Sequence, residues 1–351
     1  MIISFNSTIF QTQDEEVQSI LSKILVILIE NNHFIDEKSI SSIFFNNENK
    51  YIFDETNFAK SSLSKIDNQI LKDYISKKIT QPIPKPHRIY LTHFTIGVNL
   101  GVGEVHPRNA YQIITERSQI IVENKINDGK FIRGICQKYT SSKINKQRQS
   151  IYLLIDKAIK KGIIEFDHAG GIGEISKITK CWIDDQRYDN IYKYKLMAIF
   201  DSDKTHINDF TEKYRKLIEF LKNRPISKPP ENNDIKYENN DLIIWHILYK
   251  RKIENYIPLC ILFNKVKQIT ETQKHELKNT AKDDLDFIEY DYYNIGIGET
   301  IIKKEFPEMF LGDFSYRELE QRCEHHKVFL PEANELVSEL EQILLKIAKL
   351  I

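Results

Sequence analysis

The sequence is poor in the residues that mark several classes of protein. It contains only four cysteines among 351 residues, far apart and without a CxxC pair: Cys136, Cys181, Cys260 and Cys323. A disulfide-rich scaffold and a CxxC-type metal or redox motif are therefore excluded, and we expect free thiols in a reducing, cytoplasmic compartment. The longest apolar run near the start, residues 20–29, is interrupted by Ser22 and Lys23 and is too short to span a bilayer. No basic region precedes it, so we expect neither a signal peptide nor a membrane partner.

The chain also lacks an excess of charge of either sign. Its 50 basic residues balance its 50 acidic residues, so any affinity for nucleic acid must come from local patches of charge. A hydrophobic content of 41% and a charged content of 28% are typical of a folded globular protein. The length allows two domains, or one domain with a large addition. The glycine-rich stretch GVNLGVGEV is not followed by Lys-Ser or Lys-Thr, which excludes a Walker-type phosphate loop there.

The first part of the chain, residues 1–112, is expected to form a separate α+β unit. Residues 15–30 have apolar side chains at helical spacing, and short aromatic segments follow them. The proline-rich run QPIPKPH indicates an extended connector. No residues with an obvious chemical role stand out in this unit, so its role is unknown and an interaction or dimerisation role is the default expectation.

The second part, residues 113–262, alternates apolar strands with helices. The strands are expected at SQIIVEN, ending in Glu123, at IIEF and LMAIF, and in the strand-like run DLIIWHILYKRKIENYIP, where the strand ends at Tyr249. Helices are expected at residues 127–139, 146–161 and 209–221. This alternation is typical of an α/β domain with a mainly parallel, Rossmann-like sheet. The run LMAIF is apolar throughout, as in a strand that is covered on both faces.

Acidic residues follow two of these strands. Asp201 and Asp203 come directly after LMAIF, and Glu123 comes directly after SQIIV. The carboxyl ends of parallel strands share one edge of a sheet, where open α/β sheets bind ligands. Carboxylates held close together need a shared cation, and hard cations such as Mg²⁺ or Mn²⁺ prefer oxygen ligands. We therefore predict a metal site formed by Glu123, Asp201 and Asp203, with Asp128 and Glu254 as further candidate ligands.

The order of these motifs resembles the TOPRIM domain of topoisomerases, bacterial primases and OLD-family nucleases. IIVEN with Glu123 resembles the glutamate motif of the first strand, Gly170-Gly171 lies where the family has glycines, and FDSD resembles the DxD motif. KRKIENYIP is similar to a run in OLD-like and anti-phage nucleases. The resemblance covers about residues 115–260, but Asn124 replaces a glycine, and Asp128 is one position later than the family's acidic residue.

The resemblance implies a Mg²⁺-dependent endonuclease that acts in antiviral defence and cleaves DNA, RNA or tRNA. Because no Walker motif is found, it implies an ATPase partner on a separate chain. Lys250, Arg251 and Lys252, together with the backbone of Gly170 and Gly171, are the expected phosphate-binding groups.

Other functions stay open at this point. A non-catalytic TOPRIM subunit would serve as a sensor or scaffold, and a primase-like enzyme would transfer nucleotides. FDSDKT, with Asp201, Asp203 and Thr205, also fits the DxDxT signature of haloacid-dehalogenase-like phosphatases. That family usually has the motif on its first strand, whereas two strands are expected before it here.

The last part, residues 263–351, is expected to be a mainly helical extension. Its closing stretch, residues 331–351, has an apolar stripe at helical spacing that suits a core or a contact in a homo-oligomer. Cys323, His325 and His326 lie near one another in sequence, but no complementary pair of ligands accompanies them. We therefore interpret them as a solvated helix face and not as a zinc site.

Overall fold

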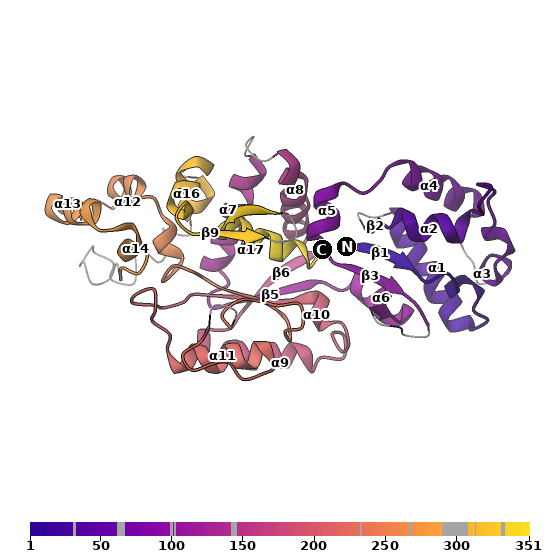
Figure 1. Cartoon of the computed structure of the whole chain (residues 1–351), viewed down its shortest axis with the longest axis horizontal. Helices are drawn as coiled ribbons and strands as arrows, with labels where there is room; N and C mark the ends of the chain where they lie inside the picture. Colours follow the sequence, from indigo (N-terminus) through magenta and orange to yellow (C-terminus); the bar gives the residue numbers. More distant parts are fainter. Residues whose placement is uncertain are drawn as a thin grey trace. The chain divides into compact units, whose positions relative to one another are not determined.

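The computed structural model describes most of the chain in two compact units. The first unit contains residues 1–116, 187–195 and 349–351, and the second contains residues 117–186 and 196–348. Figure 1 shows the elements of both units. The expected division had three parts, whereas the described parts of residues 263–348 group with the second unit. The described residues are 1–30, 33–61, 67–98, 101, 103–141, 146–231, 234–266, 269–289, 308–312, 314–330 and 334–351.

The first unit is built on a small parallel sheet. Its strand order is β2 (Phe34–Ile35), β1 (Ile2–Phe5), β3 (His93–Ile96) and β4 (Glu104–Val105), and all three pairings are parallel. We expected an α+β unit, and this expectation is wrong because the strands are parallel and helices connect β1 to β2 and β2 to β3. The physical reason is that β2 and β4 have only two residues each, too few for an alternating pattern to be recognised.

Helices and a cluster of aromatic rings complete this first unit. Phe10 lies with its ring centroid 5.2 Å from Phe5 and 5.0 Å from Phe53, and all three side chains are buried. Such edge and tilted ring contacts stabilise a core beyond the burial of apolar area. The helices are α1 (Glu15–Glu30), α2 (Glu37–Phe44), α3 (Asn57–Lys60), α4 (Asn68–Thr80), α5 (Lys85–Tyr90), α6 (Pro107–Thr115) and α10 (Tyr192–Lys195).

The second unit is built on a four-stranded sheet that is parallel throughout. The strand order is β6 (Ile164–His168), β5 (Ser118–Val122), β7 (Leu196–Phe200) and β8 (Ile244–Ile247). Every residue of β5 and β7 is buried, as expected for strands covered on both faces. The α/β class and the parallel sheet predicted for this region are therefore confirmed.

Helices cover both faces of this sheet. In Figure 1, α9 (Ile172–Ile183) and α11 (Glu212–Lys222) lie on one face, and they pack against each other. The helices α7 (Asn127–Ser141), α8 (Lys146–Lys160) and α17 (Glu339–Ala348) lie on the other face, where α8 contacts both α7 and α17. The result is a three-layer α/β arrangement, with the strands in the middle layer.

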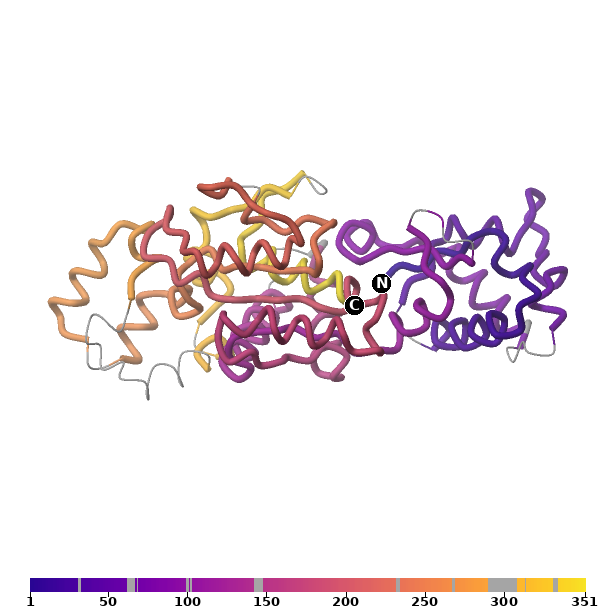
Figure 2. Tube along the Cα trace, turned by 90° about the horizontal axis from the view of Figure 1, so that it is seen from below, coloured from indigo at the N-terminus to yellow at the C-terminus, as the bar shows by residue number. Residues whose placement is uncertain are grey.

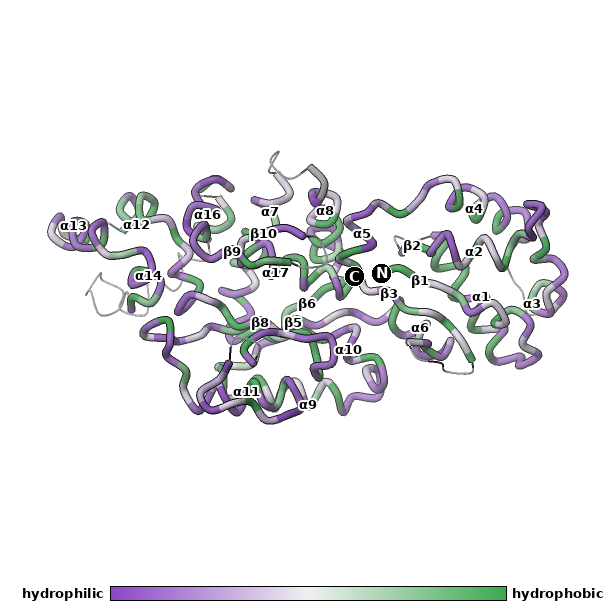
Figure 3. Tube along the Cα trace, in the orientation of Figure 1, coloured by the Kyte–Doolittle hydropathy of each residue, from purple (hydrophilic) through white to green (hydrophobic). Residues whose placement is uncertain are grey.

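The rest of the second unit follows β8. A short 3₁₀ helix, η3 (Ile253–Tyr256), leads into α12 (Leu259–Lys265), α13 (Glu271–Asn279) and α14 (Lys282–Leu285). Figure 2 shows this segment as an orange trace at one end of the unit. The helix α13 is mostly hydrophilic in Figure 3, in agreement with its single buried residue, Leu277.

The expected helix over residues 331–351 is only partly correct. Residues 331–333 lie outside the described part of the chain, and α17 begins at Glu339. An antiparallel hairpin of β9 (Lys327–Leu330) and β10 (Glu335–Ser338) precedes it. Leu336 is therefore on a strand and exposed, although its spacing to Leu340 is helical. The other apolar residues of the stripe are buried in the core: Leu340, Ile343, Leu344 and Ile347.

Among the described residues, no helix is long and apolar enough to cross a membrane.

Candidate active site

The acidic residues after β5 and β7 meet because these two strands are neighbours in the sheet. Val122 pairs with Ile199 near the carboxyl ends, so Glu123 and Asp201 leave the sheet at the same edge. The carboxylate oxygen Oε1 of Glu123 accepts a hydrogen bond from the backbone N–H of Asp201, at 3.3 Å. The backbone N–H of Ile172, at the start of α9, also donates to the Glu123 carboxylate. Two backbone donors thus fix this side chain at the edge.

Asp203 is held in an unusual backbone conformation at the same edge. Its φ of 50° lies in the left-handed region, which non-glycine residues rarely adopt. The backbone N–H groups of Ser202 and Asp203 both donate to the carbonyl oxygen of Arg251, at 3.1 and 3.0 Å. The hydroxyl of Tyr214, on α11, donates to Oδ2 of Asp203 at 2.8 Å. Neighbouring elements therefore enforce a conformation that the loop would not favour alone, as is common at functional sites.

Asp128 and Glu254 join the three carboxylates. Burial raises the pKa of Asp201 well above its ordinary range, and the charges of Asp128, Glu254, Glu123 and Asp203 act in the same direction. Burial also raises the pKa of Asp128 to about 7, with additions from Glu123 and Glu254. For Glu123, burial and then the charge of Asp203 raise the pKa. Five carboxyl groups thus interact, and they favour a bound proton or cation.

The five carboxylates are nevertheless spaced apart. Among the described residues, the only group whose three ligand atoms all lie within 4.8 Å of one another is Asp283, His325 and His326, elsewhere in the unit. The carboxylates at the sheet edge therefore do not form an equally tight cluster. All their donor atoms are oxygens, which fits a hard cation such as Mg²⁺ that retains water ligands and needs few protein ligands.

The predicted glycine loop lies beside this cluster. Gly170 and Gly171 have φ values of +80° and +138°, which an L-residue rarely adopts, and α9 starts directly after them. The N–H of Gly170 donates to the carbonyl oxygen of Glu123 at 3.1 Å. The loop after β6 is thus bonded to the loop after β5, at the same edge as the acidic residues.

The three basic residues after β8 differ in exposure and in the groups they contact. Lys252 is partly exposed, and its Nζ lies 3.8 Å from Oδ1 of Asp203. The Arg251 guanidinium is only 11% exposed, and it bonds the carbonyl oxygen of Lys204 and the carboxylate of Glu289, both at 3.1 Å. It therefore supports the loop that carries Asp203.

The prediction that Lys250 binds phosphate is wrong, because its side chain is fully buried. It forms an ion pair with Asp286, which is also fully buried. The side chain of Lys250 therefore points into the unit and not toward the surface. In this conformation Lys250 cannot reach a phosphate at the surface, and we remove it from the predicted phosphate-binding set.

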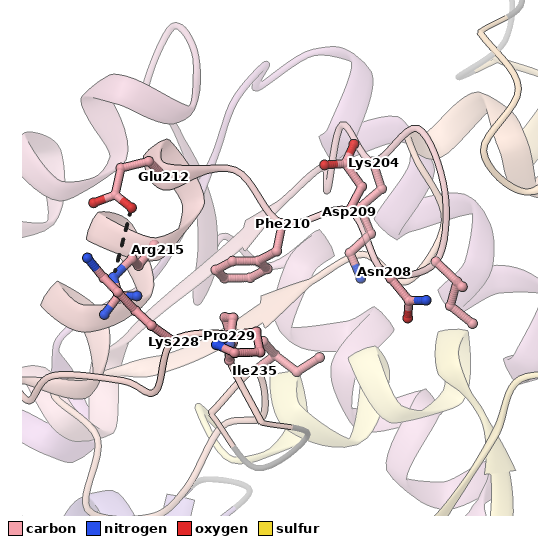
Figure 4. Close-up of a pocket in the computed structure, with 11 residues that line it drawn as sticks. Lys204, Asn208, Asp209, Phe210, Glu212, Arg215, Lys228, Pro229 and Ile235 are labelled. Carbon is pink, nitrogen blue, oxygen red and sulfur yellow. Dashed lines mark ion pairs between the residues drawn. The ribbon is translucent and has the colours of Figure 1, made fainter.

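A cavity of about 580 Å³ adjoins the loop that carries Asp203. Figure 4 shows Lys204 and Asp209 on one side, the Phe210 ring in the middle, and Arg215 with Glu212 on the other side. Lys228, Pro229 and Ile235, from the connection between α11 and β8, form a further wall. Its size falls in the range of small-molecule sites, and it combines cationic side chains with an aromatic face.

Two residues of this site were not predicted from the sequence, and two others were predicted only as further candidates. Tyr214 and Lys213, the latter with a charge that lowers the pKa of Glu123, both lie in the first turns of α11. Nothing in the sequence distinguishes them from other residues of an amphipathic helix. Asp128 and Glu254 were named only as further candidates, yet both act on Asp201.

A search of known protein families, of characterised proteins and of solved structures gave no match to this chain.

Proposed function

We propose that this chain is a Mg²⁺-dependent nuclease of the TOPRIM type that hydrolyses phosphodiester bonds of nucleic acids. One observation carries the proposal. Carboxylates from three separate segments converge at the carboxyl edge of a parallel sheet and raise one another's pKa. Stability does not explain this cluster, because a buried carboxylate without a counter-charge destabilises the folded state.

The residues at this edge have separate roles in the proposal. Glu123, Asp201 and Asp203 would hold the cation, with Asp128 and Glu254 as further ligands or as acceptors for its water ligands. When bound, Mg²⁺ would polarise the phosphodiester and stabilise charge on the attacking and leaving oxygens. Glu123 is oriented by two backbone donors, and Asp203 is oriented by Tyr214. Such support keeps ligand oxygens in place before substrate arrives.

The surroundings support a phosphate-containing substrate. Lys252 lies next to Asp203, and the Gly170-Gly171 loop brings the start of α9 to the same edge. The cavity after Asp203 offers Lys204, Lys228 and the Phe210 ring. Cationic groups and an aromatic face are what a single strand of nucleic acid needs, since its phosphates are neutralised and its bases stack.

The resemblance to OLD-like and anti-phage TOPRIM nucleases extends the proposal. We infer that the protein is the cytoplasmic effector of an anti-phage defence system and that a separate ATPase chain activates it. Co-purification with the product of a neighbouring ATPase gene, and an increase of cleavage when that product and ATP are added, test this part separately.

Cleavage of labelled single-stranded and double-stranded DNA and RNA, with Mg²⁺ or Mn²⁺ and with a chelator, tests the activity. We expect cleavage that needs the metal and is lost in Glu123→Gln and Asp201→Asn. The matched control is Glu271→Gln, which removes a carboxylate on α13 with an 88% exposed side chain. Equal loss in all three variants, or full activity in the first two, would contradict the assignment.

The same preparations separate the alternatives. Mg²⁺ binding that depends on Asp201, without cleavage under any condition, would favour a sensor or scaffold subunit. Incorporation of labelled nucleotides would favour a primase-like transferase. Release of phosphate from a phosphomonoester through an aspartyl-phosphate at Asp201 would favour the phosphatase interpretation.

A further inference from the structure

A second group of potential metal ligands lies away from the acidic edge. Asp283 is in α14, and Asp286 follows the end of that helix. His325 and His326 lie between α16 (Tyr316–Cys323) and β9. The two segments are far apart in the sequence and meet within the second unit. The mechanism proposed above uses none of these four side chains.

Both histidine rings point their Nε2 atoms at carboxylates. Nε2 of His325 lies 2.8 Å from Oδ2 of Asp286, and Nε2 of His326 lies 2.5 Å from the same oxygen. Nε2 of His325 is also 3.8 Å from Oδ1 of Asp283. One ligand atom from each of Asp283, His325 and His326 lies within 4.8 Å of the other two. Two imidazole nitrogens and two carboxylates thus lie together, with both nitrogens at hydrogen-bonding distance from Asp286.

Asp286 is oriented before any ion binds. It is fully buried, and its Oδ1 accepts from Lys250 and, at 3.0 Å, from Arg322. These two cations hold one carboxylate oxygen, so the other faces the histidines. The ring of His326 is also fixed, with its centroid 3.6 Å from that of Tyr249. Oriented ligands of this kind are typical of metal centres, where partners outside the ligand set fix the carboxylate and the rings.

Charge and exposure define which ion would fit. Lys250 and Arg322 already balance Asp286, so a divalent ion needs the further negative charge of Asp283. The side chain of Asp283 is 69% exposed, whereas those of His325 and His326 are 19% and 8% exposed. The site is thus open on the Asp283 side. Two imidazole nitrogens disfavour Mg²⁺ and Ca²⁺, which take oxygen ligands, and favour Zn²⁺ and similar transition ions.

We propose that Asp283, Asp286, His325 and His326 form a tetrahedral Zn²⁺ site, distinct from the Mg²⁺ site at the sheet edge. Four protein ligands leave no open position, so the ion is structural. It joins the α14 segment to the connection between α16 and β9. The carbonyl oxygen of Asp286 accepts from the backbone N–H of Arg251 at 3.0 Å, and the carbonyl of Arg251 holds the loop of Asp203. The ion therefore stabilises the support of the acidic edge.

Titration of the full chain with Co²⁺ tests this proposal independently of cleavage. The protein is first stripped with a chelator, and excess Mg²⁺ is kept present to occupy the carboxylate site. We expect the visible absorption of tetrahedral Co²⁺ at one ion per chain, and its loss when Zn²⁺ is added. The variants Glu123→Gln and Asp201→Asn should give the same absorption, because they alter only the other site.

A matched pair of neighbouring variants identifies the ligands. Asp283→Asn should weaken Zn²⁺ binding by about tenfold or more, while Asp284→Asn, also exposed and with the same change of charge, should leave it unchanged. His326→Gln should abolish the Co²⁺ spectrum. Because Asp283 is mostly exposed, Asp283→Asn leaves the fold intact, which far-ultraviolet circular dichroism checks. Absence of the Co²⁺ absorption in the wild type, or equal affinities of the two aspartate variants, would overturn the proposal.

Discussion

Oε1 of Glu123 accepts a hydrogen bond from the backbone N–H of Asp201, with the two atoms 3.3 Å apart. This bond joins the ends of the two central strands and brings the side chain of one acidic residue to the backbone of another. Negative charge is thereby concentrated in a partly buried place, where it is destabilising unless a cation shares it. The relationship between these two residues therefore leads to predictions about stability as well as activity.

Asp201→Asn should make the metal-free protein more stable while it abolishes Mg²⁺-dependent cleavage. Burial and four neighbouring carboxylates oppose ionisation of Asp201, and the neutral amide of similar shape removes that repulsion. We expect a gain on the order of 1 kcal/mol in the free energy of unfolding, which is typical when a functional residue is replaced. Denaturant unfolding, carried out once with a chelator and once with Mg²⁺, measures this gain in the free energy of unfolding. A loss of stability, with the Mg²⁺ response retained, would indicate a structural role for Asp201.

The stability of the metal-free protein should fall as the pH rises from about 4 to about 7. The pKa of Asp128 is raised to about 7 by burial and by Glu123 and Glu254, whereas in the unfolded chain it is near 3.8. Between these values the folded protein binds a proton that the unfolded chain has released, so stability decreases with increasing pH. Above about pH 7 both states are ionised and this contribution to the slope ends.

The same proton links pH to metal binding. Mg²⁺ must displace it, so the contribution of Asp128 should make the affinity for Mg²⁺ rise with pH up to about 7. Asp128→Asn should flatten the dependence of stability on pH, as measured by denaturant unfolding across this range with a chelator present. If the slope of stability against pH is unchanged in the variant, the proton is bound by another group.

Tyr214→Phe should weaken Mg²⁺ activation without removing a metal ligand. The Tyr214 hydroxyl donates to Oδ2 of Asp203 at 2.8 Å, and Asp203 has a left-handed backbone conformation that its neighbours must enforce. Loss of a bond that orients a ligand typically reduces metal affinity by about tenfold or more. The Mg²⁺ concentration for half-maximal cleavage should rise accordingly, while unfolding changes by only about 1 kcal/mol. An unchanged Mg²⁺ dependence would exclude this role of Tyr214.

The central strands and their acidic ends could be predicted from sequence, because a continuous apolar run of five residues indicates a strand that is buried on both faces. Local patterns cannot show where the chain turns after a strand. Lys250 turns inward because its partner is Asp286, and nothing near Lys250 in the sequence indicates that ion pair. For the same reason His325 and His326 could be interpreted as solvated, although they meet Asp286. Short strands such as β9 and β10 carry too few residues for a period to be recognised.

The last prediction concerns the two lysines after β8, of which Lys250 is buried and Lys252 is partly exposed. Lys250→Met should leave Asp286 buried with less compensation and destabilise the fold, since breaking a buried ion pair typically costs about 3–5 kcal/mol. Lys252→Ala should leave the stability nearly unchanged, because its ion pair with Asp203 is long and partly exposed.

Lys252→Ala should instead change the dependence of nucleic-acid binding on salt. The formal net charge of the chain is zero, so binding relies on local cations, and each phosphate contact releases counterions. Loss of one contact should reduce the slope of log K against log salt concentration by about one and weaken binding equally across substrate sequences. The matched control is Lys161→Ala, since Lys161 is exposed and precedes β6 at the opposite edge of the sheet. Binding is measured in Ca²⁺, which suppresses cleavage. Parallel lines for wild type, Lys252→Ala and Lys161→Ala would show that Lys252 makes no contact with a phosphate and serves only as a partner of Asp203.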